Sequence, residues 1–452
     1  MAGNLRSLLK TGHAHQRQPP LERPNITAPS HLYYACRNGD IDTVKELLLT
    51  IPYDQLNQLE PNGSTPLHVA THFGHLDIVR LLVQEYRCPR HVRDLDGRTA
   101  YQEAQTDDMR DLYRRPANEN RFNDTSTDSK QAFEIVSSIS RDDNDPPVDN
   151  DDDNEEAKPN RRYLMGFEDD EVKKQLEGLQ GVKALFQSRL GRCIMEQGMK
   201  LKLAKETEYG EEEFAYVKSE KFREEALQKI LDECVTPEHP EYKHCCHLLQ
   251  EYIQQGTIES LLRLYTLETP FYRQLLVLSN PLGFPFFIHL ADLKQRYYQG
   301  YCYRGVQLTR PELNEYYWAY RHKDSVLSLL TFSSTSVERH VAEEFSMHIA
   351  PPPNKIRALL IFYFPQVCDT AINLSAIPEY ELPCISNYEN EKEVLVGPRT
   401  FFRVTDIERN RVDEQYTIHL ENLSGKQKTV FKALKLFLLH DFKQKTNKLF
   451  HH

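Results

Sequence analysis

Two glutamates near the C-terminal end of the chain have the type and spacing that acid–base chemistry needs. Glu391 and Glu393 are separated by one lysine and directly precede the apolar run Val394–Val396. Residues two apart on an extended strand project from the same face. The spacing therefore predicts that both carboxylates can act on one bound substrate.

Two other polar segments lie upstream, each next to an apolar run that is typical of a strand. The first contains Arg304, whose guanidinium would offer a planar fork of donors to phosphate or ribose oxygens. The second is the hydroxyl-rich run Ser333–Ser336. Any one of these features alone is typical of an exposed strand edge or a surface ion pair. Their order and their apolar flanks together favour one shared site.

In chain order, the three segments resemble the arginine-specific mono-ADP-ribosyltransferases, or NAD(P)(+)–arginine ADP-ribosyltransferases. The hallmark of that family is an arginine, a Ser-x-Ser and a Glu-x-Glu on successive strands. Tyr303-Arg304-Gly305, Phe332–Ser336 and Glu391–Leu395 are similar to these elements. The resemblance extends over about Leu261–Asn422. Arg399 stands in the turn after the glutamates, where relatives often have a glycine, and this departure would alter loop geometry without removing a proposed catalytic group.

The resemblance implies a glycosyltransferase of the pentosyltransferase class that moves ADP-ribose from NAD to arginine side chains of target proteins and releases nicotinamide. NADP is the alternative co-substrate, and no metal is implied. Ser334 would also orient the catalytic glutamate. The implied roles are catalysis by Glu393, Glu391, Ser334 and Arg304, cofactor binding by Arg304, Ser334, Ser336 and Glu393, and acceptor recognition by Tyr388 and Glu391.

The chemistry of this reaction agrees with these residue types. Breaking the bond between nicotinamide and ribose passes through an oxocarbenium-like state, which an anion on one face stabilises. The resemblance gives this role to Glu393. An arginine acceptor has a pKa above about 12, so a carboxylate such as Glu391 must help to expose a nucleophilic nitrogen.

Cysteines and histidines between Cys234 and His247 raise the question of a zinc site. Consecutive Cys245 and Cys246 point to different helix faces, and the spacing matches no usual finger. A helical, metal-free interpretation is favoured. The sequence contains no Gly-x-Gly-x-x-Gly or Walker motif, so a Rossmann or kinase use of nucleotide is unsupported.

The N-terminal part repeats itself at a nearly constant period. Ala35, Ala70 and Ala104 are 35 and 34 residues apart, and the middle unit opens with Thr65-Pro66-Leu67-His68. This pattern closely resembles ankyrin repeats and predicts stacked helix pairs over residues 31–114 that bind a protein partner. Because about three units are usually needed for stability, we expect a helix near Asp107–Tyr113, or the next domain, to cap the array.

Two alternatives to a transferase stay open. In an NAD glycohydrolase, water would take the place of the acceptor. In a catalytically inactive ankyrin scaffold, the repeats would do the work and the second domain would only bind nucleotide. The intact set of Arg304, Ser334 and Glu393 weighs against the scaffold.

After Tyr301 the pattern changes from helical periodicity to strand-like runs. Helices first and strands later predict an α+β domain with a helical layer on a mainly antiparallel sheet, and the resemblance implies that the sheet is split. The predicted fold class is multidomain, with all-α ankyrin repeats followed by an α+β ADP-ribosyltransferase fold. The predicted boundaries are 1–30 for a flexible N-terminus, 31–114 for ankyrin repeats, 115–162 for an acidic disordered linker, 163–260 for a helical region, 261–422 for the catalytic domain and 423–452 for a basic amphipathic tail.

The formal net charge is −11, yet residues 142–156 alone hold nine acids and no base. The rest is close to neutral, so no nucleic-acid partner is expected. Nine cysteines without disulfide-like spacing favour reduced thiols in an intracellular, cytoplasmic protein. The chain shows no secretory signal and no membrane-spanning run. A membrane contact of the basic tail is disfavoured, and the expected partners are proteins with an accessible arginine and a protein bound by the repeats.

Overall fold

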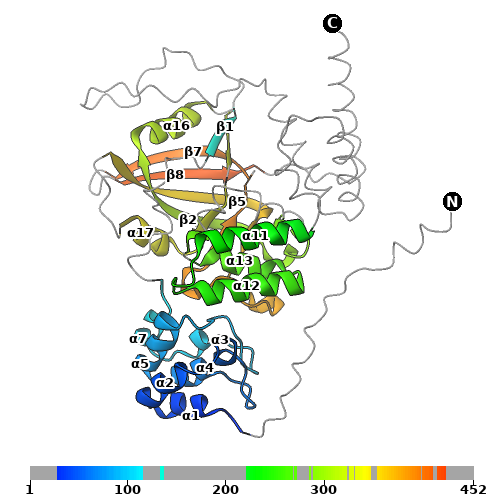
Figure 1. Ribbon diagram of the computed structural model, residues 1–452. Coiled ribbons are helices and arrows are strands. Elements are labelled where there is room, and N and C mark those ends of the chain that lie inside the picture. Colours follow the sequence, from blue (N-terminus) through cyan, green and yellow to red (C-terminus); the bar gives the residue numbers. More distant parts are fainter. Residues whose placement is uncertain are drawn as a thin grey trace, which may run out of the picture. The chain divides into compact units, whose positions relative to one another are not determined.

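The structure is a computed structural model of the chain (Figure 1). It divides into two compact units, Met1–Tyr113 and Arg114–His452. The structure describes residues 28–115, 133–136, 220–267, 269–271, 285–286, 289–322, 325–329, 331–347, 354–398, 400–410 and 415–423. Most of the predicted flexible N-terminus and acidic linker, residues 163–219 of the helical region, and the basic tail from residue 424 lie outside the described residues.

The first unit consists of short helices joined by tight turns. Several begin at a serine, aspartate or threonine whose side chain accepts a hydrogen bond from a backbone N–H three residues on. Such caps satisfy the free amides of a first turn. The elements are α1 (His31–Asn38), α2 (Ile41–Leu48), α3 (Tyr53–Leu56), α4 (Pro66–His72), α5 (Leu76–Arg80), the π-helical η1 (Leu81–Glu85), α6 (Ala100–Glu103) and α7 (Asp107–Asp111).

The Thr-Pro-Leu-His segment joins neighbouring repeats. Thr65 caps α4, and its hydroxyl lies 2.7 Å from Nδ1 of His68. The Nε2 atom of that histidine lies 3.1 Å from the carbonyl of Arg98 in the next repeat. Burial lowers the pKa of His68, which favours the neutral ring that this pair of contacts uses. The helix expected near Asp107–Tyr113 is present as α7, and its Met109 lies in the apolar core shared by the repeats.

The second unit contains a layer of three helices that lie side by side in Figure 1. They are α11 (Glu220–Cys234), α12 (Tyr242–Gln255) and α13 (Ile258–Thr266). Gly256 ends α12 in the left-handed conformation at φ 66°, which glycine adopts without steric cost. The predicted boundary at residues 260/261 falls inside α13.

An eight-stranded sheet with the order β1-β3-β7-β8-β5-β2-β4-β6 forms the rest of the second unit, and β6 also pairs with β5. All pairs are antiparallel except β5 with β8. The prediction of an α+β unit with a mainly antiparallel sheet is therefore confirmed. The strands are β1 (Phe133–Val136), β2 (Tyr297–Thr309), β3 (Val326–Leu329), β4 (Ser333–Ser336), β5 (Lys355–Asn373), β6 (Glu393–Val396), β7 (Phe401–Asn410) and β8 (Gln415–Asn422).

One of these strands lies where the sequence predicts disorder. Strand β1 falls within the predicted acidic linker, and it pairs with all four residues of β3. The backbone groups of this edge strand are paired with those of its neighbour.

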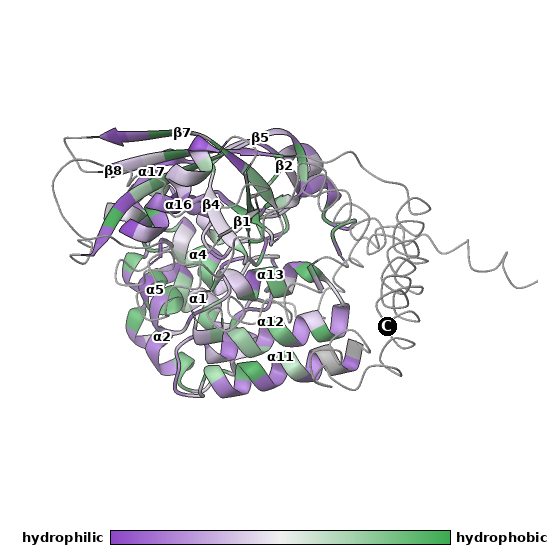
Figure 2. Cartoon of the chain, turned by 90° about the horizontal axis from the view of Figure 1, so that it is seen from above, coloured by the Kyte–Doolittle hydropathy of each residue, from purple (hydrophilic) through white to green (hydrophobic). Residues whose placement is uncertain are grey.

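Successive side chains of the short strand β6 point to opposite faces of the sheet and pack into two different apolar cores. Leu395 lies in the core formed with the helical layer, whereas Val394 and Val396 lie in the core on the other side of the sheet. Strand β7 extends beyond this core, because its first residues are buried and its last ones are exposed. Figure 2 shows the corresponding change from hydrophobic to hydrophilic colour along β7.

Two helices cover parts of the sheet: α16 (Arg310–Arg321) and α17 (Arg339–Met347). Helix α17 approaches β2 closely at Gly305. A Cβ atom at that glycine would lie 2.0 Å from the carbonyl oxygen of Ala342, so a side chain there would push the helix away from the strand. Among the described residues, no helix combines the length and apolarity needed to cross a bilayer.

Candidate active site

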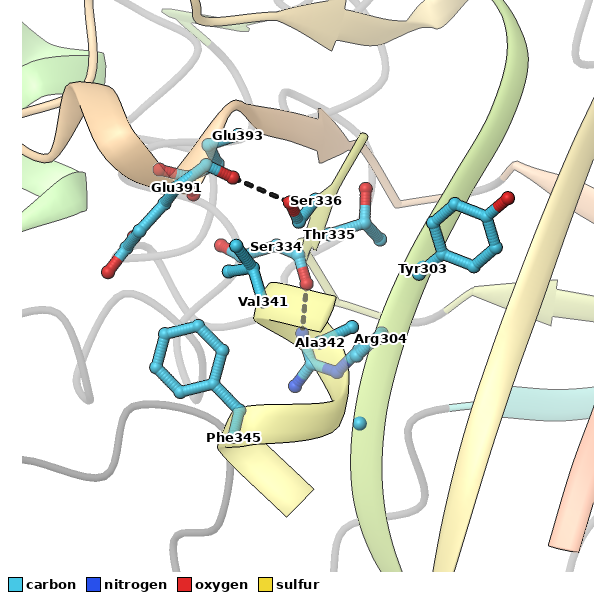
Figure 3. A pocket seen from close by; sticks show the side chains of 11 residues that line it. Tyr303, Arg304, Ser334, Thr335, Ser336, Val341, Ala342, Phe345, Glu391 and Glu393 are labelled. Atoms are coloured by element: carbon cyan, nitrogen blue, oxygen red, sulfur yellow. Dashed lines mark hydrogen bonds between the residues drawn. The ribbon is translucent and has the colours of Figure 1, made fainter. Parts of the chain in front are cut away.

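One pocket brings together all three polar segments that the sequence singles out (Figure 3). Strand β2 contributes Tyr303–Gly305, and β4 contributes Ser334–Ser336. Helix α17 supplies Val341, Ala342 and Phe345 as an apolar wall. Glu391 and Glu393 complete the lining.

Strand pairing accounts for the meeting of the serine and glutamate segments. Ser336 stands opposite Glu393 in the β4–β6 pair and opposite Tyr303 in the β2–β4 pair. Directly opposed residues of an antiparallel pair project from the same face. Ser334 and Ser336 of β4 therefore share a face with Glu393.

The backbone conformation that places the two glutamates in the pocket differs from the predicted strand. Glu391 ends a 3₁₀ turn, η5 (Glu389–Glu391), and Lys392 has a left-handed φ of 46°. Only Glu393 belongs to a strand. The prediction that both carboxylates follow strand alternation is wrong, because the intervening residue reverses the local backbone. Both side chains are nevertheless buried and line the same pocket.

Arg304 reaches from β2 toward β4, as Figure 3 shows. Its Nη1 donates to the carbonyl oxygen of Ser334 at 2.9 Å and to Oγ of Ser333 at 3.2 Å. These bonds hold a half-buried, permanently charged guanidinium at the pocket wall.

The three β4 hydroxyls that line the pocket differ in their hydrogen bonds. Oγ1 of Thr335 donates to the carbonyl of Val394, and Oγ of Ser336 donates to the carbonyl of Glu391 and accepts from the amide of Glu338. Oγ of Ser334 is buried and has no hydrogen-bond partner among the described residues. A buried hydroxyl left in this way costs about 1–3 kcal/mol, so Ser334 is the hydroxyl that a ligand can satisfy.

Glu393 is oriented by a residue that the sequence analysis does not single out. Oγ of Ser386 donates to Oε2 of Glu393 at 3.0 Å. The same hydroxyl accepts a bond from the amide of Tyr388 at 3.2 Å. The predicted orienting bond from Ser334 is absent among the contacts of the described residues. A loop serine seven residues before a glutamate carries no sequence signal that would identify it.

Glu391 is engaged by an arginine that the sequence analysis assigns to the disordered linker. Nε of Arg115 donates to Oε1 of Glu391 at 2.8 Å, and Nη2 donates to Oε2 at 3.1 Å. The guanidinium carbon lies 3.9 Å from the centre of the Tyr388 ring. Tyr388 is buried, with 1% of its surface exposed. The acceptor-recognition residues proposed from the resemblance thus contact a guanidinium in the structure.

The histidines and cysteines considered for zinc extend from the end of α11 at Cys234, through His239 in the connecting segment, to His244–His247 in α12. His244 pairs with Glu241 and His247 with Glu251, each at 3.4 Å, and burial raises the pKa of Cys245. The part of the chain that the structure describes contains no group of three or more side chains placed to hold a metal ion.

The first unit also matches a known protein family. Residues 32–113 match a family model for ankyrin repeats (3 copies). The first unit is therefore an array of ankyrin repeats, as its period predicts.

The chain is similar, at low identity, to several solved structures. The type III effector XopAI from Xanthomonas axonopodis pv. citri is 15% identical over 57% of this chain and 100% of that chain, with a TM-score of 0.31. Exoenzyme S from Pseudomonas aeruginosa, in complex with human 14-3-3 protein beta and bound to Carba-NAD, is 18% identical over 46% of this chain and 97% of that chain, with a TM-score of 0.26. Vis toxin, an ADP-ribosyltransferase from Vibrio splendidus, is 19% identical over 47% and 90%, with a TM-score of 0.24. Similarity at this level does not define an activity.

Proposed function

We propose that the second unit transfers ADP-ribose from NAD to arginine side chains of proteins, and that the ankyrin repeats select or position the target. The observation that carries this proposal is the composition of one pocket. A guanidinium, a buried hydroxyl without a partner among the described residues, and two buried carboxylates line it together. Repeat arrays of this kind bind proteins, which suits an enzyme with a protein substrate.

Arg304 and Ser334 are the groups suited to hold the dinucleotide. The planar guanidinium matches phosphate or ribose oxygens, and its bonds to β4 fix its direction. The Ser334 hydroxyl would gain its missing hydrogen bond from a ribose oxygen or hydroxyl. Ser336 has a structural role instead, because its hydroxyl already bonds to the carbonyl of Glu391 and the amide of Glu338. These bonds connect β4 to the turn before Glu393.

Glu393 is suited to stabilise the reacting sugar. Its carboxylate is 2% exposed, and Ser386 fixes the direction of one oxygen. As the bond between nicotinamide and ribose breaks, positive charge develops on the ribose. A fixed anion in a site with little water stabilises that charge more than it would in bulk solvent.

Glu391 is suited to bind and deprotonate the acceptor. Its carboxylate accepts two N–H bonds from Arg115, and this contact supports a role in binding an arginine side chain. The ring of Tyr388 covers the same guanidinium, and an aromatic face stabilises a cation at this distance. An incoming arginine that makes these contacts would place a terminal nitrogen beside a base.

The test is the reaction of the purified 452-residue chain with NAD and agmatine. Agmatine is decarboxylated arginine, so it carries the same guanidinium on an alkyl chain. We expect ADP-ribosyl-agmatine and nicotinamide in equal amounts. Glu393→Gln should lower the rate by roughly 10²–10³-fold, as loss of one preorganised stabilising group does. Glu379→Gln, an exposed glutamate in the same loop, is the matched control and should retain the native rate. A Glu393→Gln variant with native activity would rule out the mechanism.

Glu391→Gln separates transfer from hydrolysis. The amide keeps the shape of the side chain and can still accept a hydrogen bond, but it cannot act as a base that removes a proton from a guanidinium. Transfer to agmatine should therefore fall while release of free ADP-ribose persists. If the native protein releases only free ADP-ribose whatever guanidine is present, it is an NAD glycohydrolase.

Parallel assays with NAD and NADP decide which dinucleotide serves as co-substrate.

A further inference from the structure

Arg115 occupies the position that the proposed function reserves for the acceptor. It is the second residue of the second unit, and 4% of its side chain is exposed, against 5% for the Glu391 side chain. Besides its two bonds to that carboxylate, Nη2 lies 3.4 Å from the carbonyl oxygen of Thr266 at the end of α13. Carboxylate, aromatic ring and carbonyl oxygen thus surround one guanidinium.

A purely structural ion pair would explain these contacts less completely. Replacing a buried ion pair by apolar residues is often neutral for stability, so stability alone gives no reason to keep this one. The carboxylate involved is also one of the two that line the pocket, only two residues from Glu393. The charge that Arg115 neutralises is therefore the one that an external arginine would need.

We propose that Arg115 is an internal acceptor, and that the enzyme transfers ADP-ribose to its own Arg115 before or in competition with external arginines. This inference rests on the proposed function and adds a specific modification site to it. Nε and Nη2 of Arg115 both donate to Glu391, and Nη2 is the terminal nitrogen of the two, so it is the one assigned to attack the ribose.

The step balances without any further reactant. Glu391 takes a proton from Nη2, and the nitrogen lone pair forms a bond to C1 of the ribose. The bond between that carbon and the nicotinamide nitrogen breaks, and its electron pair leaves with neutral nicotinamide. The proton passes from Glu391 to solvent. The products are ADP-ribosylated Arg115, nicotinamide and one proton.

An acceptor within the same chain has a kinetic signature. Its effective concentration is set by the fold and does not change with dilution. Modification of Arg115 should therefore proceed with a rate constant that is independent of protein concentration. Transfer between molecules would instead accelerate as the protein concentration rises.

The experiment incubates the same purified chain with NAD at two protein concentrations and locates the modification by tandem mass spectrometry. The matched variants are Arg115→Lys, which keeps a positive charge but has no guanidinium, and Arg114→Lys at the exposed neighbouring position. We expect modification of Arg115 in the native protein and in Arg114→Lys, with the same rate constant at both concentrations, and none at this position in Arg115→Lys.

Agmatine in the same reactions provides a second readout. If Arg115 fills the acceptor position in nine of ten molecules, the apparent KM for agmatine should fall about ten-fold in Arg115→Gln, which has no charge to compete for Glu391, because the competent fraction sets the apparent affinity. The Arg114→Lys variant should keep the native KM.

The outcomes separate this inference from the proposed function. Transfer to agmatine without modification of Arg115 would overturn the internal acceptor and leave the proposed function intact. So would modification of Arg115 at a rate that rises with protein concentration. Absence of any NAD cleavage would overturn both. If Arg115→Lys fails to fold, site localisation and concentration dependence in the native protein still decide the matter.

Discussion

Alanine substitution of two serines on one strand should have different effects on the free energy of unfolding. Ser334 and Ser336 are both buried on β4, at 0% and 4% exposure. Oγ of Ser334 has no hydrogen-bond partner among the described residues, whereas Oγ of Ser336 bonds to the carbonyl of Glu391 at 2.6 Å and to the amide of Glu338 at 2.9 Å. The two serines therefore allow a matched comparison between a hydroxyl without such bonds and a bonded hydroxyl in the same four-residue strand.

The expected magnitudes follow from these contacts. A buried polar group without a partner costs about 1–3 kcal/mol. Ser334→Ala removes such a group, so it should leave the free energy of unfolding of the NAD-free protein unchanged or raise it by up to that amount. Ser336→Ala strips a buried carbonyl of its donor and should lower the free energy of unfolding by about 1–3 kcal/mol.

Fluorescence in a urea titration can measure this difference in the second unit alone. Trp318 is the only tryptophan of the chain, and it is buried in the core around α16. NAD affinity is measured by calorimetry with both substitutions placed in a Glu393→Gln background, which limits turnover. Ser334→Ala should weaken binding by about 2- to 13-fold, the equivalent of one hydrogen bond worth about 0.5–1.5 kcal/mol.

Either of two results would refute the reasoning. If Ser334→Ala destabilises the second unit as much as Ser336→Ala does, its hydroxyl is engaged in the free protein. If NAD binds Ser334→Ala with native affinity, the hydroxyl does not contact the dinucleotide.

Two further predictions concern packing and thiol reactivity in the second unit. Gly305→Ala should lower the free energy of unfolding by at least about 1–3 kcal/mol, because the added Cβ would lie 2.0 Å from the Ala342 carbonyl; an unchanged urea midpoint would show that α17 moves away freely. Cys302 and Cys384 should resist iodoacetamide at neutral pH, because burial raises the pKa of both thiols to about 12. Both should be labelled once the protein is unfolded, and rapid labelling of the native protein, read by mass spectrometry, would contradict this.

Regular patterns made part of this structure predictable from sequence. The spacing of Ala35, Ala70 and Ala104 reflects a stacked unit that repeats, and the family match confirms it. The meeting of the serine and glutamate segments was also predictable, because neighbouring strands place opposed residues such as Ser336 and Glu393 on one face. The direction of Arg304 was not, because the residue of β2 that stands opposite Ser336 is Tyr303.

Features that depend on tertiary contacts or on single backbone angles were not predictable. The sequence Glu391-Lys392-Glu393 is compatible with a strand, and only the left-handed φ of Lys392 shows that the strand begins at Glu393. Arg115 is 276 residues from its partner Glu391, and no local pattern links two residues so far apart. The acidic composition that follows Arg115 argues for disorder, while a buried carboxylate holds Arg115 itself in place.

The end of α13 is bonded to the loop that precedes Glu391. Asn387, next to Tyr388, donates from its amide and side chain to Oγ1 of Thr266, and from its side chain to the carbonyl of Arg263. Arg263 in turn donates to the carbonyl of Cys384 at 3.1 Å, and its pKa, lowered by burial to about 10, keeps it charged at neutral pH. The loop before Glu391 is thus bonded to the last turn of α13 at two points. Since the carbonyl of Thr266 also accepts from Arg115, the end of α13 both positions the loop and contacts the arginine that the loop binds.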